Sequence, residues 1–294
     1  MTRPRRILLA TDLSARCDRA LDRAANLAAT WQAELIAVHA LERASNYASA
    51  REHSLPSWRR PPDMKAVVEQ QLRRDMLQAA PNVTAIVEEG EPSDVILRTA
   101  AKYQCELIVT GIARDETLGR FGLGATVDRL LKRSRVPLLI VKQRVRGPYG
   151  NILVTTDLSE SSRHALRGAM GFFPDHRLSI LHAFDPPMAG MTGDPARYRE
   201  DYKDMIAGDY QTFLDETGLA PEQARNFHHL VEYGHPSLLV RQYATDRGVD
   251  LVVLGTHGRS GFLDILIGST AKEILSELSC DALVIREPRA VVES

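Results

Sequence analysis

Short apolar runs alternate with amphipathic stretches along the whole 294-residue chain. In its second half, the runs that predict buried strands are rich in aliphatic residues and end at polar ones. They cover Asn151–Thr155, Leu178–Phe184, Phe227–Glu232, Asp250–Gly255 and Ala282–Arg286. The stretches between them have helical spacing and cover Ser159–Phe172, Arg197–Thr217, Pro236–Arg247 and Thr270–Leu278. Strands that alternate with helices pair in parallel through right-handed crossovers. The pattern therefore predicts an α/β fold with an open, doubly wound, five-stranded parallel sheet.

The pattern occurs twice in the chain. The motif Thr-Asp-Leu-Ser at 11–14 returns at 156–159, and Gly-x-Pro-Ser at 90–93 returns at 234–237. The distance between the copies stays at 143 to 145 residues throughout. A repeat of that length is a complete small domain, and it predicts two such domains in tandem.

A joint rich in Gly and Pro separates the two copies at 142–150. We therefore expect one domain at 1–146 and a second at 147–294. The first carries 24 Lys and Arg against 17 Asp and Glu, and the second carries 13 against 21, so their net charges are near +7 and −8. Opposite charges favour docking of the two halves on one another. The arginines of the first half are scattered rather than clustered, so nucleic-acid binding is not expected.

Composition places the chain among globular proteins, with 44% hydrophobic and 26% charged residues. No apolar run reaches the roughly 18 residues that a membrane span requires. The apolar run after the basic start is Ile7–Ala10, too short for a secretory signal. Cys17, Cys105 and Cys280 are widely spaced and form no C-x-x-C pair, which is typical of a reducing compartment. We expect a cytoplasmic protein that has no contact with membranes.

Candidate chemistry gathers where the strands of the second half end. In a doubly wound sheet, ligands bind outside the carboxyl ends of the strands at the point where strand order reverses. The first strand ends at Thr156-Asp157, and the fourth ends at Gly255. Gly268-Ser269 opens the last helix, where free N–H groups and the positive end of the helix dipole favour a phosphate. Asp157 is able to accept hydrogen bonds from ribose hydroxyls or to help hold a metal beside phosphates.

The arrangement G-x2-G-x9-G-S at Gly255, Gly258, Gly268 and Ser269 resembles the ATP-binding signature of universal stress proteins. The repeated Thr-Asp-Leu-Ser, the run Gly-Thr-His-Gly-Arg-Ser-Gly and the strand ending Leu-His-Ala are similar to the same family. The resemblance covers essentially the whole chain, twice. It implies two sheets of the adenine-nucleotide alpha-hydrolase-like type. Because single-domain members pair through their last strands, it also implies an intrachain pseudo-dimer, in which Val136–Val141 pairs with Ala282–Arg286.

The resemblance also implies a ligand, ATP, together with Mg²⁺. By this resemblance, the residues that would hold the adenosine are Thr156, Asp157 and Ala183. Those that would line the phosphate path are Leu254, Gly255, Gly258, Arg259, Gly268, Ser269, Thr270 and Ala271. No dedicated nucleophile or acid–base pair accompanies them. The expected function is an ATP-binding regulator of the stress response rather than an enzyme, with slow ATP hydrolysis or self-phosphorylation left open.

The first half departs from this signature. Its equivalent positions are Gly111, Arg114, Gly124 and Ala125, so an arginine replaces the second glycine and an alanine replaces the serine. A long side chain at Arg114 would obstruct close approach of the backbone to a phosphate, and Ala125 offers no hydroxyl. An alternative role for the Arg114 cation is to fill the phosphate pocket and pair with Asp12. The sequence predicts a degenerate nucleotide site in this half, with binding of a different anion left open.

Simpler interpretations compete with the ligand site. Ser269 or Thr270 could serve only as an N-cap, and Thr270 with Glu273 has the spacing of a capping box. Asp157 could be a turn residue that caps the following helix. His39 and His182 end equivalent strands and are interpreted as packed structural histidines.

Two other functions remain as alternatives. One is a nucleotide-independent scaffold that keeps the fold and binds an unidentified protein partner. The other is an enzyme acting on an adenylated or nucleotide substrate, against which the absence of a lysine-rich catalytic signature argues. Association of two chains into a homodimer is also open.

Overall fold

The computed structural model describes residues 1–15, 17–41, 63–79, 83–112, 123–185, 195–219, 222–223, 226–256 and 267–287. Within the first half, the strands are β1 (Arg6–Ala10), β2 (Glu34–Leu41), β3 (Thr84–Glu89), β4 (Leu107–Gly111) and β5 (Leu138–Val141). The helices are α1 (Asp18–Trp31), α3 (Met64–Ala79), α4 (Pro92–Lys102) and α5 (Ala125–Arg133).

The second half repeats this order. Its strands are β6 (Ile152–Thr156), β7 (Leu178–Phe184), β8 (His228–Tyr233), β9 (Leu251–Gly255) and β10 (Asp281–Ile285). Its helices are α6 (Glu160–Phe172), α7 (Pro195–Glu216), α9 (Pro236–Asp246) and α10 (Ser269–Glu277). Each strand and helix predicted for this half lies within two residues of its observed bounds, because each is encoded by a local apolar period.

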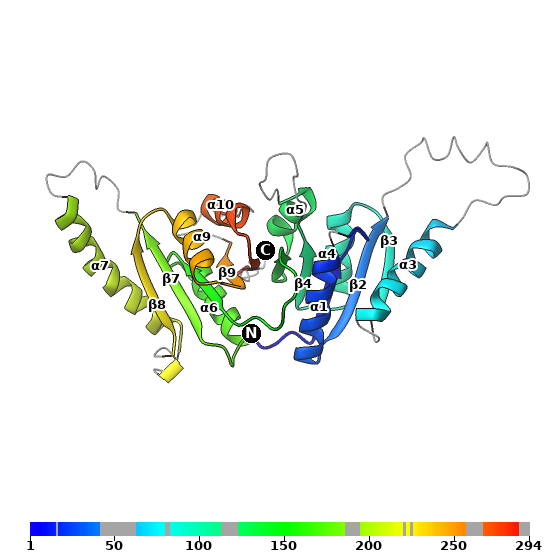
Figure 1. Ribbon diagram of the computed structural model, residues 1–294, viewed down its shortest axis with the longest axis horizontal. Coiled ribbons are helices and arrows are strands. Elements are labelled where there is room, and N and C mark those ends of the chain that lie inside the picture. Colours follow the sequence, from blue (N-terminus) through cyan, green and yellow to red (C-terminus); the bar gives the residue numbers. More distant parts are fainter. Residues whose placement is uncertain are drawn as a thin grey trace, which may run out of the picture.

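All ten strands belong to one sheet in the order β3-β2-β1-β4-β5-β10-β9-β6-β7-β8. Strands within each half are parallel, and the two halves join where β5 and β10 pair antiparallel, with Leu139 opposite Leu283. Figure 1 shows the two halves side by side, with α3 and α7 at opposite outer ends. The predicted fold class and the predicted intrachain pairing of the last strands are both confirmed.

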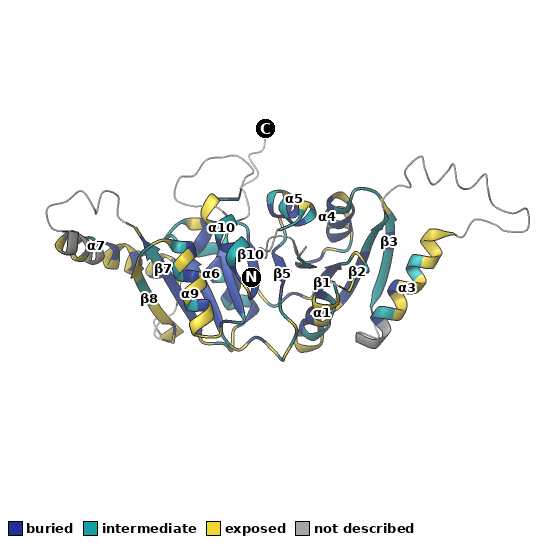
Figure 2. Ribbon diagram, turned by 45° about the horizontal axis from the view of Figure 1, so that its top comes forward, coloured by how far each residue is buried: buried dark blue, intermediate teal, exposed yellow. Residues whose placement is uncertain are grey.

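Helices cover both faces of the sheet. The apolar side chains of α1, α3, α6 and α7 form one core cluster with one face, and those of α4, α5, α9 and α10 form a second cluster with the other face. Each cluster contains residues of both halves. Figure 2 shows the buried residues concentrated on the central strands and the exposed ones on the outer helices, such as α7 and α9. The halves therefore share their hydrophobic cores across the junction.

A buried polar network crosses this junction. The carboxylate of Asp281, fully buried at the start of β10, accepts hydrogen bonds from the Lys142 backbone N–H (2.8 Å) and from the Tyr149 hydroxyl (2.7 Å). Arg23 on α1 forms an ion pair with Asp281, with 3.3 Å between Nε and Oδ2. The Arg23 guanidinium carbon also lies 4.0 Å from the centre of the Tyr149 ring. Each buried charge in the network has a partner of opposite sign, as burial of charge requires.

Ion pairs across the junction run in both directions, so they follow the opposite net charges of the halves only in part. Arg3–Asp175 and Arg23–Asp281 join a cation of the first half to an acid of the second, whereas Lys272–Asp128 runs the other way.

Among the described residues, no helix combines the length and the apolar character that a membrane span requires. All three cysteines carry free thiols, and Cys105 and Cys280 are buried.

Candidate functional site

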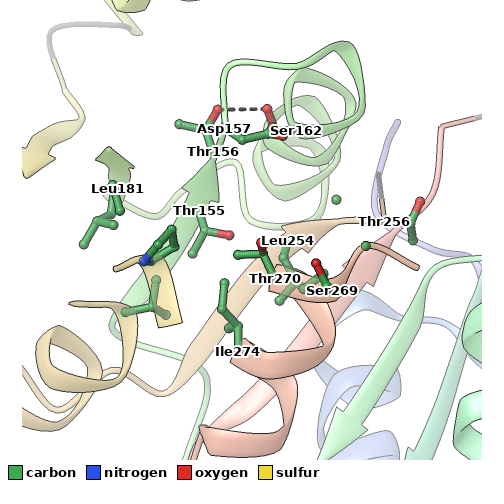
Figure 3. Close-up of a pocket in the computed structure, with 16 residues that line it drawn as sticks. Thr155, Thr156, Asp157, Ser162, Leu181, Leu254, Thr256, Ser269, Thr270 and Ile274 are labelled. Carbon is green, nitrogen blue, oxygen red and sulfur yellow. Dashed lines mark hydrogen bonds between the residues drawn. The ribbon is translucent and has the colours of Figure 1, made fainter. Parts of the chain in front are cut away.

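A cavity of about 270 Å³ opens at the switch point of the second half, between the ends of β6 and β9. Its volume lies just below the range of about 300–1,000 Å³ that is typical of small-molecule sites. Figure 3 shows its lining, which comes from the ends of the parallel strands β6, β7 and β9, from helices α6 and α9 and from the first two turns of α10. The residues that line it are Thr155, Thr156, Asp157, Ser162, Leu181, Ala183, Pro236, Val240, Leu254, Gly255, Thr256, Gly268, Ser269, Thr270, Ala271 and Ile274.

A tight turn after β6 holds Asp157 at the cavity. The Asp157 Oδ1 accepts hydrogen bonds from the Ser159 hydroxyl (2.6 Å) and from the Ser159 backbone N–H (3.1 Å). Leu158 adopts φ 66°, a left-handed conformation that is strained for a leucine and that clusters at functional sites. Its N–H donates to the Thr156 hydroxyl, 2.9 Å away. Asp157 is thus a turn residue, as one interpretation predicted, but Ser159 rather than Asp157 is the N-cap of the following helix. The same turn brings the Asp157 carboxylate to the cavity wall.

Hydroxyl groups connect this turn to helix α6. Ser159 is the N-cap of α6, and its side chain accepts a hydrogen bond from the Ser162 N–H at 3.2 Å. The Ser162 hydroxyl lies 2.8 Å from the Thr156 hydroxyl, the bond drawn in Figure 3. On the neighbouring strand, His182 Nδ1 lies 2.9 Å from the Thr156 carbonyl oxygen. His182 is 5% exposed, so it acts as a buried link between β6 and β7 and matches the structural role expected for it.

The N-terminus of α10 faces the cavity without a side-chain cap. Gly268 is the N-cap residue, and among the described residues no side chain is seen to cap this helix end. The simpler interpretation, that Ser269 or Thr270 serves as the N-cap, is therefore wrong: Ser269 and Thr270 lie inside the first turn. The first N–H groups of a helix have no partner within it, and together with the helix dipole they favour an anion.

The two glycines that flank this end differ in what they require. A Cβ on Gly255 would come within 2.8 Å of the Ser161 hydroxyl and 2.9 Å of the Ser161 carbonyl oxygen. Gly255 is therefore needed for the close packing of β9 against α6. Gly268 has φ −58°, a conformation open to any residue, and its N–H donates to the Thr256 carbonyl oxygen at 2.9 Å. A positive φ thus plays no part at Gly268, contrary to the general reason for a glycine at such a site.

Apolar side chains form the wall opposite the hydroxyls. Leu181, Val240, Leu254 and Ile274 contribute to it and are at least two-thirds buried. Sequence reasoning missed several members of the lining: Thr155, Ser162, Leu181, Pro236, Val240, Thr256 and Ile274. Period-2 alternation would have found Leu181 from Ala183, and the i, i+4 rule would have found Ile274 from Thr270. The same alternation would have found Thr256 from Leu254, whereas Ser162 carries no such signal, because only the packing of α6 on β9 brings it in.

The structure brings together most of the site residues predicted from the sequence. Those that line the cavity are Thr156, Asp157, Ala183, Leu254, Gly255, Gly268, Ser269, Thr270 and Ala271. Gly258 and Arg259 lie outside the described residues.

A second cavity, of about 500 Å³, occupies the equivalent place in the first half. It is lined by Thr11, Asp12 and Cys17 near the end of β1, by Gly111 at the end of β4 and by Gly124 and Ala125 at the start of α5. Burial acts to raise the pKa of Asp12, but hydrogen bonds from Ser14 outweigh it and lower this pKa. Gly124 has φ 73°, unlike Gly268. The degenerate signature thus does not remove the cavity; Arg114 lies outside the described residues.

The chemistry available in the cavity of the second half is limited. Among its described lining residues, Asp157 is the only titratable side chain. In the described part of the chain, no three His, Cys, Asp or Glu side chains gather as a metal site would require. A single carboxylate still suits Mg²⁺, which takes one or two protein carboxylates together with substrate phosphates and water. The lining offers hydroxyls, free N–H groups and an apolar wall, which suit binding better than acid–base catalysis.

Comparison with known proteins agrees with this geometry. The sequence model of the universal stress protein family matches residues 4–142 and again residues 148–286. Universal stress protein E of Escherichia coli is 23% identical over 245 residues, which are 75% of this chain and 73% of that protein. Universal stress protein A homolog 2 of Coxiella burnetii is 28% identical over 141 residues, 47% of this chain and 95% of its own length.

Solved structures show the same fold over nearly the whole chain. A universal stress protein from Archaeoglobus fulgidus superposes with a TM-score of 0.67 at 17% sequence identity, covering 97% of this chain and 99% of its own. The two family matches together span most of the sequence, and the strand order of each half repeats about the junction. The chain therefore belongs to the universal stress protein family, in the form with two family domains in tandem.

Proposed function

We propose that the second half binds ATP, with Mg²⁺, and that the protein is a nucleotide-dependent regulator in the stress response. The observation that carries this proposal is the meeting of Asp157, the apolar wall and the uncapped N-terminus of α10 around one cavity. Thr156, Asp157 and Ala183 would hold the adenosine. The phosphates would lie along the first turn of α10, beside Ser269 and Thr270, and Mg²⁺ beside the phosphates.

A regulatory role, rather than an enzymatic one, is proposed because the described lining holds one carboxylate and no second titratable group to act as an acid or a base. Catalysis by general acid–base chemistry needs a positioned proton donor or acceptor for each transferred proton. Occupancy of the cavity would then act by favouring one conformation or one protein partner over another.

The proposal is tested by calorimetric titration with Mg²⁺-ATP of variants that fill one cavity at a time. Ala183 lines the cavity of the second half, and Ala40 lines the other at the equivalent position. Ala183→Leu should abolish binding, because the added side chain occupies the cavity, whereas Ala40→Leu should bind one equivalent like the unmodified protein. Gly258→Arg, which copies Arg114 into the second half, should also abolish binding.

Other outcomes redirect the proposal. Loss of binding in Ala40→Leu alone would move the nucleotide site to the first half. Two equivalents bound by the unmodified protein would show that the first half is not degenerate. No binding, in protein freed of co-purified nucleotide, would favour the nucleotide-independent scaffold.

A further inference from the structure

A cationic side chain of each half donates hydrogen bonds to the C-terminal end of the last helix of the other half. The Lys142 ammonium, at the end of the first half, donates hydrogen bonds to the carbonyl oxygens of Leu275 (2.5 Å) and Leu278 (2.8 Å) at the end of α10. The Arg286 guanidinium, at the end of the second half, donates to the carbonyl oxygen of Lys132 (2.7 Å) at the end of α5. Lys142 and Arg286 follow the paired strands β5 and β10 directly, so they occupy equivalent places about the junction.

These bonds supply what α10 lacks by itself. The last carbonyls of a helix have no partner within it, and a cation there is favoured by the helix dipole. The last turn of α10 contains no basic residue of its own. With 9 residues, α10 is also short of the length at which a helix is stable alone, so its placement depends on tertiary contacts. Lys142 is 2% exposed, so solvent screens its bonds little.

The same helix links this contact to the cavity. A helix of nine residues is about 14 Å long, so its two ends move together. Ser269, Thr270 and Ala271 at its start line the cavity, while Leu275 and Leu278 near its end bind Lys142. The Lys142 N–H donates across the junction to Asp281, and its carbonyl accepts a bond from Arg19 of its own half at 2.7 Å.

We propose that Lys142, which belongs to the first half, is a positioning residue for the cavity of the second half: its hydrogen bonds fix the position of α10. Ligand binding in the cavity and pairing of the two halves therefore stabilise each other. Coupling of this kind is reciprocal, because a ligand that favours one placement of α10 also favours the contact that holds it. The coupling rests on the proposed function, since it requires a ligand in this cavity. The placement of α10 by Lys142 does not.

The test uses the full chain with Lys142→Met, and Arg286→Met as the matched control. Amide hydrogen exchange of α10 is measured without nucleotide, and the Kd for Mg²⁺-ATP is measured by calorimetry. In Lys142→Met we expect both the exchange rate in α10 and the Kd to rise about tenfold. In Arg286→Met, exchange should rise in α5 and stay unchanged in α10. Lys142→Arg should restore both readouts, because an arginine already performs this role for α5.

The outcomes separate the two proposals. Unchanged exchange in α10 of Lys142→Met overturns the positioning role, and so does an equal rise in Arg286→Met, which would indicate general loosening. If the unmodified protein binds no ATP, the proposed function fails while the exchange comparison still decides the positioning role. If Lys142→Met does not fold, Lys142→Gln takes its place, because it also removes the charge; unchanged α10 exchange in that variant contradicts the proposal.

Discussion

The two cavities share one frame and differ in their lining. In both halves the Thr-Asp-Leu-Ser turn places its leucine at positive φ, 60° at Leu13 and 66° at Leu158. In both, a histidine Nδ1 lies 2.9 Å from the carbonyl oxygen of the turn threonine. The backbone that supports a site has therefore been kept twice, independently of the side chains that face the ligand.

The lining of the second half is richer in hydroxyls. Its Thr155, Ser162, Thr256 and Ser269 stand where the first half has Ala10, Cys17, Ile112 and Ala125. The Cys17 thiol stays uncharged at neutral pH, because burial raises its pKa to about 11. The first cavity is the larger, at about 500 Å³ against about 270 Å³. The difference teaches that loss of a glycine signature changes what a cavity offers a ligand without closing it.

The two halves also contribute different residues to the junction. Removing the Asp281 network should have the largest effect on the free energy of unfolding among the variants compared. Asp281 begins β10, whereas Pro137 stands at the equivalent position before β5. Asp281→Ala would leave the Arg23 guanidinium buried without its carboxylate and the Lys142 backbone N–H without its acceptor. We expect it to lower the free energy of unfolding by about 3–5 kcal/mol. Pro137→Ala should change it by less than about 1 kcal/mol. Urea denaturation of both variants checks this; equal losses would show that the network adds no stability.

The two cations at the junction give a pH-dependent contrast. Burial lowers the pKa of Lys142 from 10.5 to about 8, although Cys280 and Asp281 act to raise it. Between these values the unfolded chain binds the proton that the folded chain has released, so the free energy of unfolding rises with pH. Relative to Lys142→Arg, which does not titrate here, the unmodified protein should gain at most about 3 kcal/mol from pH 8 to pH 10.5.

Denaturation of both proteins across this range measures the gain. The free energy of unfolding of Lys142→Arg is subtracted from that of the unmodified protein at each pH, which removes the contribution of the buried cysteines that both proteins share. The titratable groups that act on Lys142 are Asp281 on β10 and the neighbouring Cys280. Arg19 on α1 also contacts Lys142, through the Lys142 carbonyl oxygen, while Arg23 and Tyr149 contact the other side of Asp281. A difference that does not vary with pH would mean that the Lys142 amine keeps its proton throughout.

A smaller effect should distinguish the glycines that begin α5 and α10. Both are N-cap residues, but Gly124 has φ 73° and Gly268 has φ −58°. An added Cβ on Gly268 would meet nothing closer than the Thr256 carbonyl oxygen at 3.8 Å. Gly124→Ala should therefore lose about 1–2 kcal/mol more of the free energy of unfolding than Gly268→Ala. Thermal denaturation of the two variants measures these losses. Equal losses of the free energy of unfolding in Gly124→Ala and Gly268→Ala would contradict the prediction.

Much of the candidate site could be predicted because its backbone positions are local to strand ends. The ends of β6 and β9 and the start of α10 follow from apolar periods, and the switch point of a doubly wound sheet brings them together. Ser162 could not be predicted, since it enters the lining only because Gly255 lets α6 pack closely on β9. The N-cap interpretation of Ser269 and Thr270 is wrong because α10 begins at Ser269, one residue before the predicted start, so Gly268 is the N-cap. The Gly268 N–H donates to the Thr256 carbonyl oxygen, a contact that depends on the tertiary structure.

The sequence by itself determined the duplication, the alternation of strands and helices and the family, because periodicity and repeated motifs are local properties of the chain. Only the tertiary structure decided how the halves meet in detail. The contacts of Arg23 and Lys142 with Asp281 join residues more than 130 positions apart. No local pattern encodes which cation reaches which carboxylate or helix end, because that depends on how two sheets, each already folded, bury their last strands against one another.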